Sequence, residues 1–165
     1  NTVPNFANQN IHRTIEQIRS LIGFEAGPSI SIERDYDPSI PDVFIDSDMM
    51  QQAILNIARN ALQALGDSGK ITFITRIQRQ QMIQGQRHPL CVEIKIIDNG
   101  VGIPQDIRDT LFYPMITSKT DGTGLGLSIA QSLVEHHKGK IEVESWPGHT
   151  EFSILLPIYN QEPTQ

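Results

Sequence analysis

The pattern of apolar and polar positions predicts two amphipathic helices in the first part of the chain. Isoleucines recur at helical spacing within residues 10–22, at Ile11, Ile15, Ile18 and Ile22. A longer apolar stripe runs over residues 50–65. Ser47 or Asp48 can cap the start of this second helix, and Gly66 follows its end.

Alternation with a period of two predicts strands in the rest of the chain. The alternating segments are residues 29–41 (broken by two prolines), 42–46, 70–78, 91–98, 140–145 and 151–157. Residues 79–89 are polar and irregular, so we expect a loop that joins two hairpin strands. Residues 99–123 contain only one plausible short helix, near 104–112. Irregular segments of that length inside a compact domain are usually functional.

A third helix is predicted over residues 125–138, with Gly139 as its C′ glycine. Helices alternate irregularly with strands that pair as hairpins near the end, which favours an α+β fold over a doubly wound parallel sheet. With 165 residues, we expect one domain.

Composition narrows the function classes. A hydrophobic content of 38% and a charged content of 19% exclude a disordered acidic chain and a fibrous one. The net charge of −6 argues against nucleic-acid or anionic-membrane partners, which need a dense basic patch. No apolar run reaches the roughly 18 residues of a membrane span, so we expect a cytoplasmic domain. The single cysteine, Cys91, is expected to be a small buried hydrophobe in a strand.

The stretch "NIARNA" places Asn56 and Asn60 one turn apart on the second helix. Most such residues are simply a solvated polar face. Asparagine is nevertheless a mediocre helix former, and its carboxamide oxygen suits a Mg²⁺ ion that is otherwise held by phosphates and water.

The stretch "DNGVGI" follows a strand. Asp98 there can accept a hydrogen bond from an exocyclic amine, which is a way to read adenine, and Gly100 and Gly102 let the backbone approach a flat ligand. The alternative is a β-turn in which Asp-Asn-Gly does only turn work.

The stretch "TDGTGLGLSIAQSL" sets Gly122, Gly124 and Gly126 before the third helix. It matches neither the Walker pattern nor the dinucleotide fingerprint. Backbone N–H groups and the helix dipole still favour an anion at this place. Lys119 could add a phosphate contact.

In this order and spacing, the motifs resemble those of the GHKL ATP-binding superfamily, and specifically the catalytic ATP-binding domain of sensor histidine kinases. "NIARNA" is similar to the N box, "DNGVGI" to the G1 box, "LFYPMITSK" to the F box, "GTGLGLSIA" to the G2 box and "PGHTEF" to a G3-like turn. "NALQALG", "DTLFYPM" and "SWPGHTEFS" most resemble nitrogen-regulation kinases. The resemblance implies a two-layer α/β sandwich with a mixed, mostly antiparallel sheet, helices on one face and an ATP lid over about residues 105–124.

The resemblance also implies ATP and Mg²⁺ as cofactors, with Asn60 as the metal ligand. Asp98 would bind the adenine amino group, and Thr150 would lie near the adenine. The implied nucleotide-binding residues are Asn56, Asn60, Asp98, Gly100, Gly102, Ile103, Lys119, Gly122, Thr123, Gly124, Leu125, Gly126, Lys140 and Thr150.

The phosphoacceptor histidine of such kinases stands in an H-E/D-x-K/R-x-P context, which none of the five histidines here has. The resemblance therefore implies a separate phosphoacceptor and dimerisation domain as a partner, together with a response regulator (NtrC-like) and the PII signal protein. Two alternatives are a hydrolytic GHKL ATPase and a nucleotide-sensing interaction module. The ATPases carry a glutamate as general base where this chain has Asn56, which favours the kinase.

Overall fold

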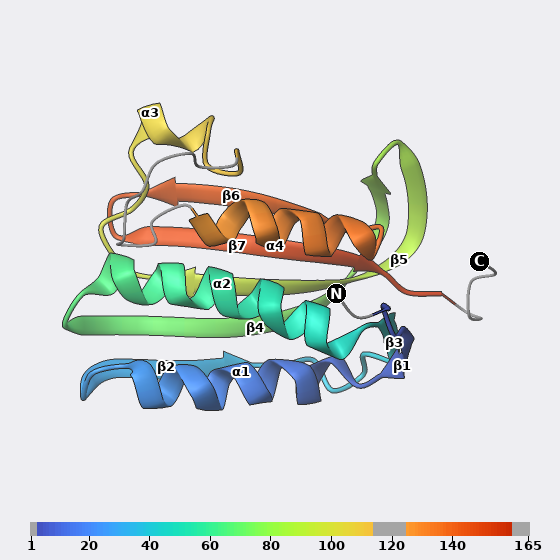
Figure 1. Ribbon diagram of the computed structural model, residues 1–165, viewed down its shortest axis with the longest axis horizontal. Helices are drawn as coiled ribbons and strands as arrows, with labels where there is room; N and C mark the ends of the chain where they lie inside the picture. Colours follow the sequence, from blue (N-terminus) through green and yellow to red (C-terminus); the bar gives the residue numbers. More distant parts are fainter. Residues whose placement is uncertain (1–2, 114–124, 160–165) are drawn as a thin grey trace.

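The computed structural model describes residues 3–113 and 125–159, and a five-stranded sheet forms one of its two layers (Figure 1). The strand order is β2-β4-β5-β7-β6, in which β2 and β4 are parallel and the other neighbours are antiparallel. The strands of this sheet are β2 (Ser29–Asp35), β4 (Ser68–Ile83), β5 (Gln86–Asp98), β6 (Lys140–Trp146) and β7 (His149–Pro157). Strands β1 (Ala7–Gln9) and β3 (Val43–Ile45) pair separately.

Three helices cover one face of the sheet, as Figure 1 shows: α1 (Ile11–Glu25), α2 (Ser47–Leu65) and α4 (Leu125–His136). A short helix, α3 (Gln105–Arg108), lies in the segment after β5. The predicted two-layer, mostly antiparallel α+β architecture is confirmed. In the described part of the chain, no helix has the length and apolar character needed to cross a bilayer.

The apolar stripes of the helices and the inward positions of the strands form one core. The predicted isoleucines of α1 are at most 3% exposed, and so are Ile54 and Ile57 of α2. In the sheet, Phe73, Ile94 and Phe152 face the helices and are at most 1% exposed. Cys91 is fully buried in β5, as predicted. The two periods of the sequence therefore identify which face of each element is buried.

The start of α2 differs from the prediction by one residue. Its N-cap is Asp46, whose carboxylate accepts a hydrogen bond from the Met49 N–H at 3.0 Å. Asp46 has extended backbone angles, whereas Ser47 and Asp48 are already helical. Asp46, Ser47 and Asp48 are all residue types that are favoured at the N-cap, so only the backbone angles show which of them caps the helix.

The prediction of a loop over residues 79–89 is wrong. Strands β4 and β5 continue to Ile83 and Gln86, joined by Gln84 and Gly85. Both turn residues have positive φ (51° and 79°), as in a type I′ hairpin turn. No third strand pairs with this arm within the described residues, so most of its side chains meet water and the alternation is lost. Ile83 alone turns inward, into a small buried cluster.

The end of α4 also corrects a prediction. The left-handed C′ residue is Lys138 (φ 60°), and the Gly139 N–H closes the helix by donating to the Val134 carbonyl oxygen at 3.0 Å. Gly139 is glycine for another reason: a Cβ there would collide with the Leu155 carbonyl oxygen. The residue therefore sets how closely the helix end approaches β7.

A buried histidine connects the end of α4 to the start of α2. His137 is 6% exposed, its Nε2 accepts a hydrogen bond from the Asp46 backbone N–H at 3.1 Å, and its Nδ1 donates to the Leu133 carbonyl oxygen at 2.8 Å. The Phe6 ring lies 4.7 Å away. Burial lowers the pKa of His137, and the accepting Nε2 requires the neutral ring.

Candidate functional site

A row of buried polar side chains crosses the sheet where β5 ends. Asp98 of β5 pairs with Thr150 of β7, and Thr150 pairs with Ser145 of β6. These three side chains are 2%, 1% and 6% exposed. They occupy inward positions, where neighbours along the same strands are apolar core residues such as Ile96 and Phe152. Polar groups in such positions need partners or a ligand, so this end of the sheet is the first candidate site.

Asp98 holds the loop that follows it. Its Oδ1 accepts a hydrogen bond from the Gly100 N–H at 2.9 Å. Burial raises the pKa of Asp98, because the charged form loses hydration; the Gly100 N–H and the nearby His149 act in the opposite direction. Its other carboxylate oxygen makes no hydrogen bond to any described residue. One acceptor of the carboxylate therefore remains available to a ligand.

The two glycines of the loop are required by protein packing. A Cβ on Gly100 would lie 2.6 Å from the Ala64 carbonyl oxygen of α2. A Cβ on Gly102, which has φ +87°, would lie 2.7 Å from the Trp146 carbonyl oxygen of β6. The loop is also held to the β6–β7 turn, since the Gly148 N–H donates to the Gly100 carbonyl oxygen at 3.0 Å. The two glycines correctly predicted that another group comes close to this loop. The groups that come close are backbone carbonyl groups of α2 and β6, whereas the prediction was a flat ligand.

Helix α2 brings the two predicted asparagines to the same region. Asn56, Asn60 and Ala64 are spaced by four residues and share a face of α2, and Ala64 contacts the Gly100 loop. The Asn56 Oδ1 accepts a hydrogen bond from Gln52 Nε2 at 2.9 Å. Asn60 is partly exposed, and its amide makes no hydrogen bond to another described residue. Its carboxamide oxygen is therefore available for a ligand next to the loop.

Ser145 and Arg108 are site residues that sequence reasoning missed. The Ser145 hydroxyl accepts a hydrogen bond from the Ile103 N–H at 2.8 Å and lies 2.8 Å from the Thr150 hydroxyl. Arg108 of α3 donates from Nη2 to the Ser145 and Ile103 carbonyl oxygens at 2.6 and 3.3 Å. A serine at an inward position of a strand is a signal that could have identified Ser145. Nothing in the sequence spacing indicates Arg108.

Lys140 lies apart from this row. It begins β6, whereas Ser145 lies near the other end of that strand. Its ammonium group pairs with the Glu142 carboxylate at 3.1 Å, on the face of the sheet opposite to the helices. The structure does not bring Lys140 to Asp98 and Thr150.

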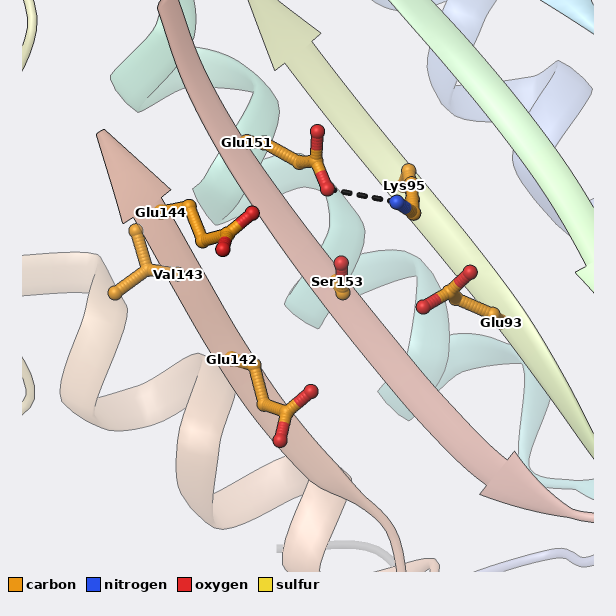
Figure 2. A pocket seen from close by; sticks show the side chains of 7 residues that line it. All are labelled: Glu93, Lys95, Glu142, Val143, Glu144, Glu151 and Ser153. Atoms are coloured by element: carbon orange, nitrogen blue, oxygen red, sulfur yellow. Dashed lines mark hydrogen bonds and ion pairs between the residues drawn. The ribbon is translucent and has the colours of Figure 1, made fainter. Parts of the chain in front are cut away.

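The face of the sheet opposite to the helices has its own hollow. Figure 2 shows carboxylates from β5, β6 and β7 that project from this face, with the helices behind the strands. The residues lining this hollow are Glu93, Lys95, Glu142, Val143, Glu144, Glu151 and Ser153. Lys95 donates to Glu151 at 2.7 Å, and this ion pair helps lower the pKa of Glu151. Of the implied nucleotide-binding residues that the structure describes, none lines this hollow.

The glycine-rich stretch falls largely outside the described residues. Lys119, Gly122, Thr123 and Gly124 lie there, and so does most of the predicted lid. Helix α4 begins at Leu125, and the side chain of Leu125 is not described. Among the residues that the structure does describe, no cluster of three or more His, Cys, Asp and Glu side chains forms a metal site.

Comparisons with known proteins identify the family of this chain. Residues 45–160 match the family described as histidine kinase-, DNA gyrase B- and HSP90-like ATPase. The chain is similar to proteins named sensory histidine kinase/phosphatase NtrB, with 53% identity over 152 residues in Vibrio alginolyticus and 51% over 151 residues in Klebsiella oxytoca. Each match covers 91% of this chain and 43% of the relative, so the chain spans less than half the length of these proteins.

A solved structure shares the fold. It is a nucleotide-free form of the catalytic domain of histidine kinase ThkA, with 28% identity and a TM-score of 0.77, and the match covers 93% of this chain and 96% of that one.

Proposed function

Because this chain belongs to the family of histidine kinase-, DNA gyrase B- and HSP90-like ATPases, we propose that it binds Mg-ATP and supplies the γ-phosphoryl group for phosphorylation of a histidine. The acceptor histidine lies on a separate dimerisation domain of a nitrogen-regulation sensor kinase. The names of the two NtrB relatives, which are about half identical to this chain, support the nitrogen-regulation assignment.

In this proposal the polar row at the end of β5 binds the adenine base. Asp98 has one carboxylate oxygen without a partner among the described residues, and this oxygen accepts a hydrogen bond from the exocyclic amine. Thr150, paired with Asp98 across the strands, provides a hydroxyl at the same edge of the base. The Gly100 and Gly102 loop, packed against α2 and the β6–β7 turn, lies beside these two side chains.

Asn60 is the proposed protein ligand of the metal. Its amide has no protein partner among the described residues, and a neutral oxygen donor suits a cation held mainly by phosphate and water. When bound, Mg²⁺ supplies charge neutralisation on the triphosphate. The task of Asn60 is to orient that cation relative to the base, through the packing of α2 against the Gly100 loop.

The presence of an asparagine at position 56 favours a kinase over a hydrolytic ATPase. Water is a poor nucleophile and needs a general base, but an amide cannot take a proton at this position. The Asn56 Oδ1 is moreover engaged by Gln52 Nε2 at 2.9 Å. A neutral imidazole already carries a nucleophilic lone pair near pH 7, so transfer to histidine requires no base on α2.

The remaining parts of the proposal follow from the same family. The lid covers about residues 105–124, of which the structure describes 105–113. The phosphoacceptor domain lies outside this chain, a response regulator receives the phosphoryl group, and the PII signal protein controls the kinase. The proposed location is cytoplasmic, with neither nucleic acid nor membrane as a partner.

Mixing experiments test this function. The 165-residue chain, γ-labelled Mg-ATP and the separately produced dimerisation domain of the Vibrio alginolyticus relative should give label on that domain that is lost in acid and kept in base, as expected for phosphohistidine. The chain alone should bind Mg-ATP and release little phosphate. Asp98→Asn serves as the matched variant, and it should lower labelling at limiting ATP.

Two results would decide against the kinase. Rapid release of phosphate without the acceptor domain would identify a hydrolytic ATPase. Nucleotide binding with neither hydrolysis nor labelling would identify a sensing module.

A further inference from the structure

We infer that Ser145 is a positioning residue that sets the direction of the Thr150 hydroxyl and thereby contributes to the choice of adenine over guanine. This inference rests on the proposed nucleotide function and extends it to a residue outside the five boxes, which precedes the "PGHTEF" turn by two positions. It starts from the row Ser145–Thr150–Asp98, which crosses three adjacent strands on the buried face.

The hydrogen-bond partners of Ser145 restrict where its proton points. The Ile103 N–H donates to Oγ at 2.8 Å, so one lone pair of Ser145 is used. The only other partner of this hydroxyl among the described residues is Thr150 Oγ1, at 2.8 Å. If Thr150 donated to Ser145, the Ser145 proton would remain without an acceptor among the described residues, in a side chain that is 6% exposed, even with a nucleotide bound next to Asp98. A buried donor without a partner is unfavourable.

In the opposite direction, the one hydroxyl proton without a partner among the described residues is that of Thr150, which is 1% exposed, and a nucleotide or water bound next to Asp98 gives this proton an acceptor. The Ile103 N–H donates to Ser145, and Ser145 donates to Thr150. The Thr150 proton is then directed away from Ser145, on the side where its other cross-strand neighbour is Asp98. Hydrogen bonds that run head to tail in this way strengthen one another. With a nucleotide bound, this direction satisfies both hydroxyls, and the series of hydrogen bonds ends in a donor on the side of Asp98, whose second carboxylate oxygen has no partner among the described residues.

This pair of groups matches one purine and not the other. The Watson–Crick edge of adenine carries an amino donor next to a ring-nitrogen acceptor, whereas guanine carries a carbonyl acceptor next to a ring N–H donor. Asp98 as acceptor and Thr150 as donor complement adenine and oppose guanine. A water molecule between Thr150 and the ring keeps the same direction of the hydrogen bonds. It accepts from Thr150 and donates its own protons to Asp98 and the ring nitrogen.

The surroundings hold Ser145 in place. Arg108 Nη2 donates to the Ser145 carbonyl oxygen at 2.6 Å, so α3 holds this part of β6 as well as the loop carbonyl of Ile103. The rotamer of Ser145 is further fixed by the Ile103 N–H. Without the Ser145 hydroxyl, the Thr150 hydroxyl has no partner among the residues that the structure describes, and its proton can point either way.

The test compares the binding of Mg-ATP and Mg-GTP to the full 165-residue chain by calorimetry. Ser145→Ala should lower the ratio of the GTP to the ATP dissociation constant by about three- to tenfold, the size of one neutral hydrogen bond. Ser145→Thr keeps the hydroxyl and should restore the ratio to within about twofold of the original chain. Ser153→Ala is the matched control: Ser153 is also buried in β7, but it lies on the opposite face of the sheet, and the ratio should not change.

A double-mutant cycle separates positioning from support of the fold. In a Thr150→Val background, Ser145→Ala should leave the ratio unchanged, because the hydroxyl that it orients is gone. Equal weakening of both nucleotides by Ser145→Ala, with an unchanged ratio, would overturn the inference and leave the proposed function intact. Failure of the original chain to bind either nucleotide would overturn both.

Discussion

Replacing Asp98 by asparagine should change stability and nucleotide binding in opposite directions. The carboxylate is 2% exposed, and burial raises its pKa above the ordinary value. A raised carboxyl pKa means that the folded state is penalised for carrying the charge at neutral pH, and that stability is regained as pH falls through the folded pKa. Asparagine has no charge to bury and keeps an oxygen for the Gly100 N–H. The variant without nucleotide should therefore unfold at the same temperature or a higher one at pH 7.5.

The cost of this substitution should appear in binding. A hydrogen bond to a charged acceptor contributes about 1.5–3 kcal/mol and a neutral one about 0.5–1.5 kcal/mol. The difference of roughly 1–1.5 kcal/mol corresponds to about a tenfold rise in the dissociation constant for Mg-ATP or ADP. Calorimetric titration and thermal unfolding of the same samples measure both quantities. Unchanged affinity would mean that Asp98 only caps the turn, and a large fall in unfolding temperature would refute the argument from burial.

Three further substitutions, with a control for the first of them, test other parts of the structure. Gly102→Ala should lower the free energy of unfolding in urea by about 1–3 kcal/mol, because the residue has φ +87° and the new Cβ would lie 2.7 Å from the Trp146 carbonyl oxygen. Gly148→Ala, with φ +91° and no atom within 4 Å of the new Cβ, is the control for strain alone and should cost less. His137 has a lowered pKa, so the unfolded chain binds its proton first and stability should fall as pH drops through about 6.5. In His137→Gln, the urea midpoint of unfolding should depend less on pH in that range. An equally steep dependence would contradict the conclusion that the neutral form of buried His137 stabilises the fold. Asn60→Ala should weaken ATP binding in the presence of Mg²⁺ and much less in EDTA, so an equal loss under both conditions would exclude the ligand role.

The elements that were predicted correctly are those with one buried and one solvated face. The isoleucines of α1 and the alternation in β5 reflect a core that removes every inward side chain from water. The β4–β5 arm was missed because it leaves the sheet, so both of its faces are largely polar and only Ile83 turns inward. Sequence patterns also fail to give the exact ends of helices. Asp46 is the N-cap of α2 and Lys138 the C′ residue of α4 because of their backbone angles, which neighbouring residues could equally have adopted.

The family resemblance was confirmed by the match over residues 45–160. The structure places Asp98 next to Gly100 and Thr150, and their role in nucleotide binding stays a prediction. Ser145 and Arg108 were missed because their roles depend on partners far apart in sequence. Ile103 is 42 residues before Ser145, and Arg108 is 37 residues before it. No local pattern encodes such a pairing, which arises only when β6 is placed next to β7.

If the row of polar residues binds the base as proposed, nucleotide binding also reports whether the strands are correctly aligned. Each of three strands contributes one residue, and neighbouring positions of β7 point to the opposite face. A slip of β7 by one residue would replace Thr150 by His149 or Glu151 and leave the base without its hydroxyl. Only chains with the correct β5–β7–β6 ladder can therefore bind, and nucleotide added during refolding should draw misaligned chains toward the native ladder by mass action.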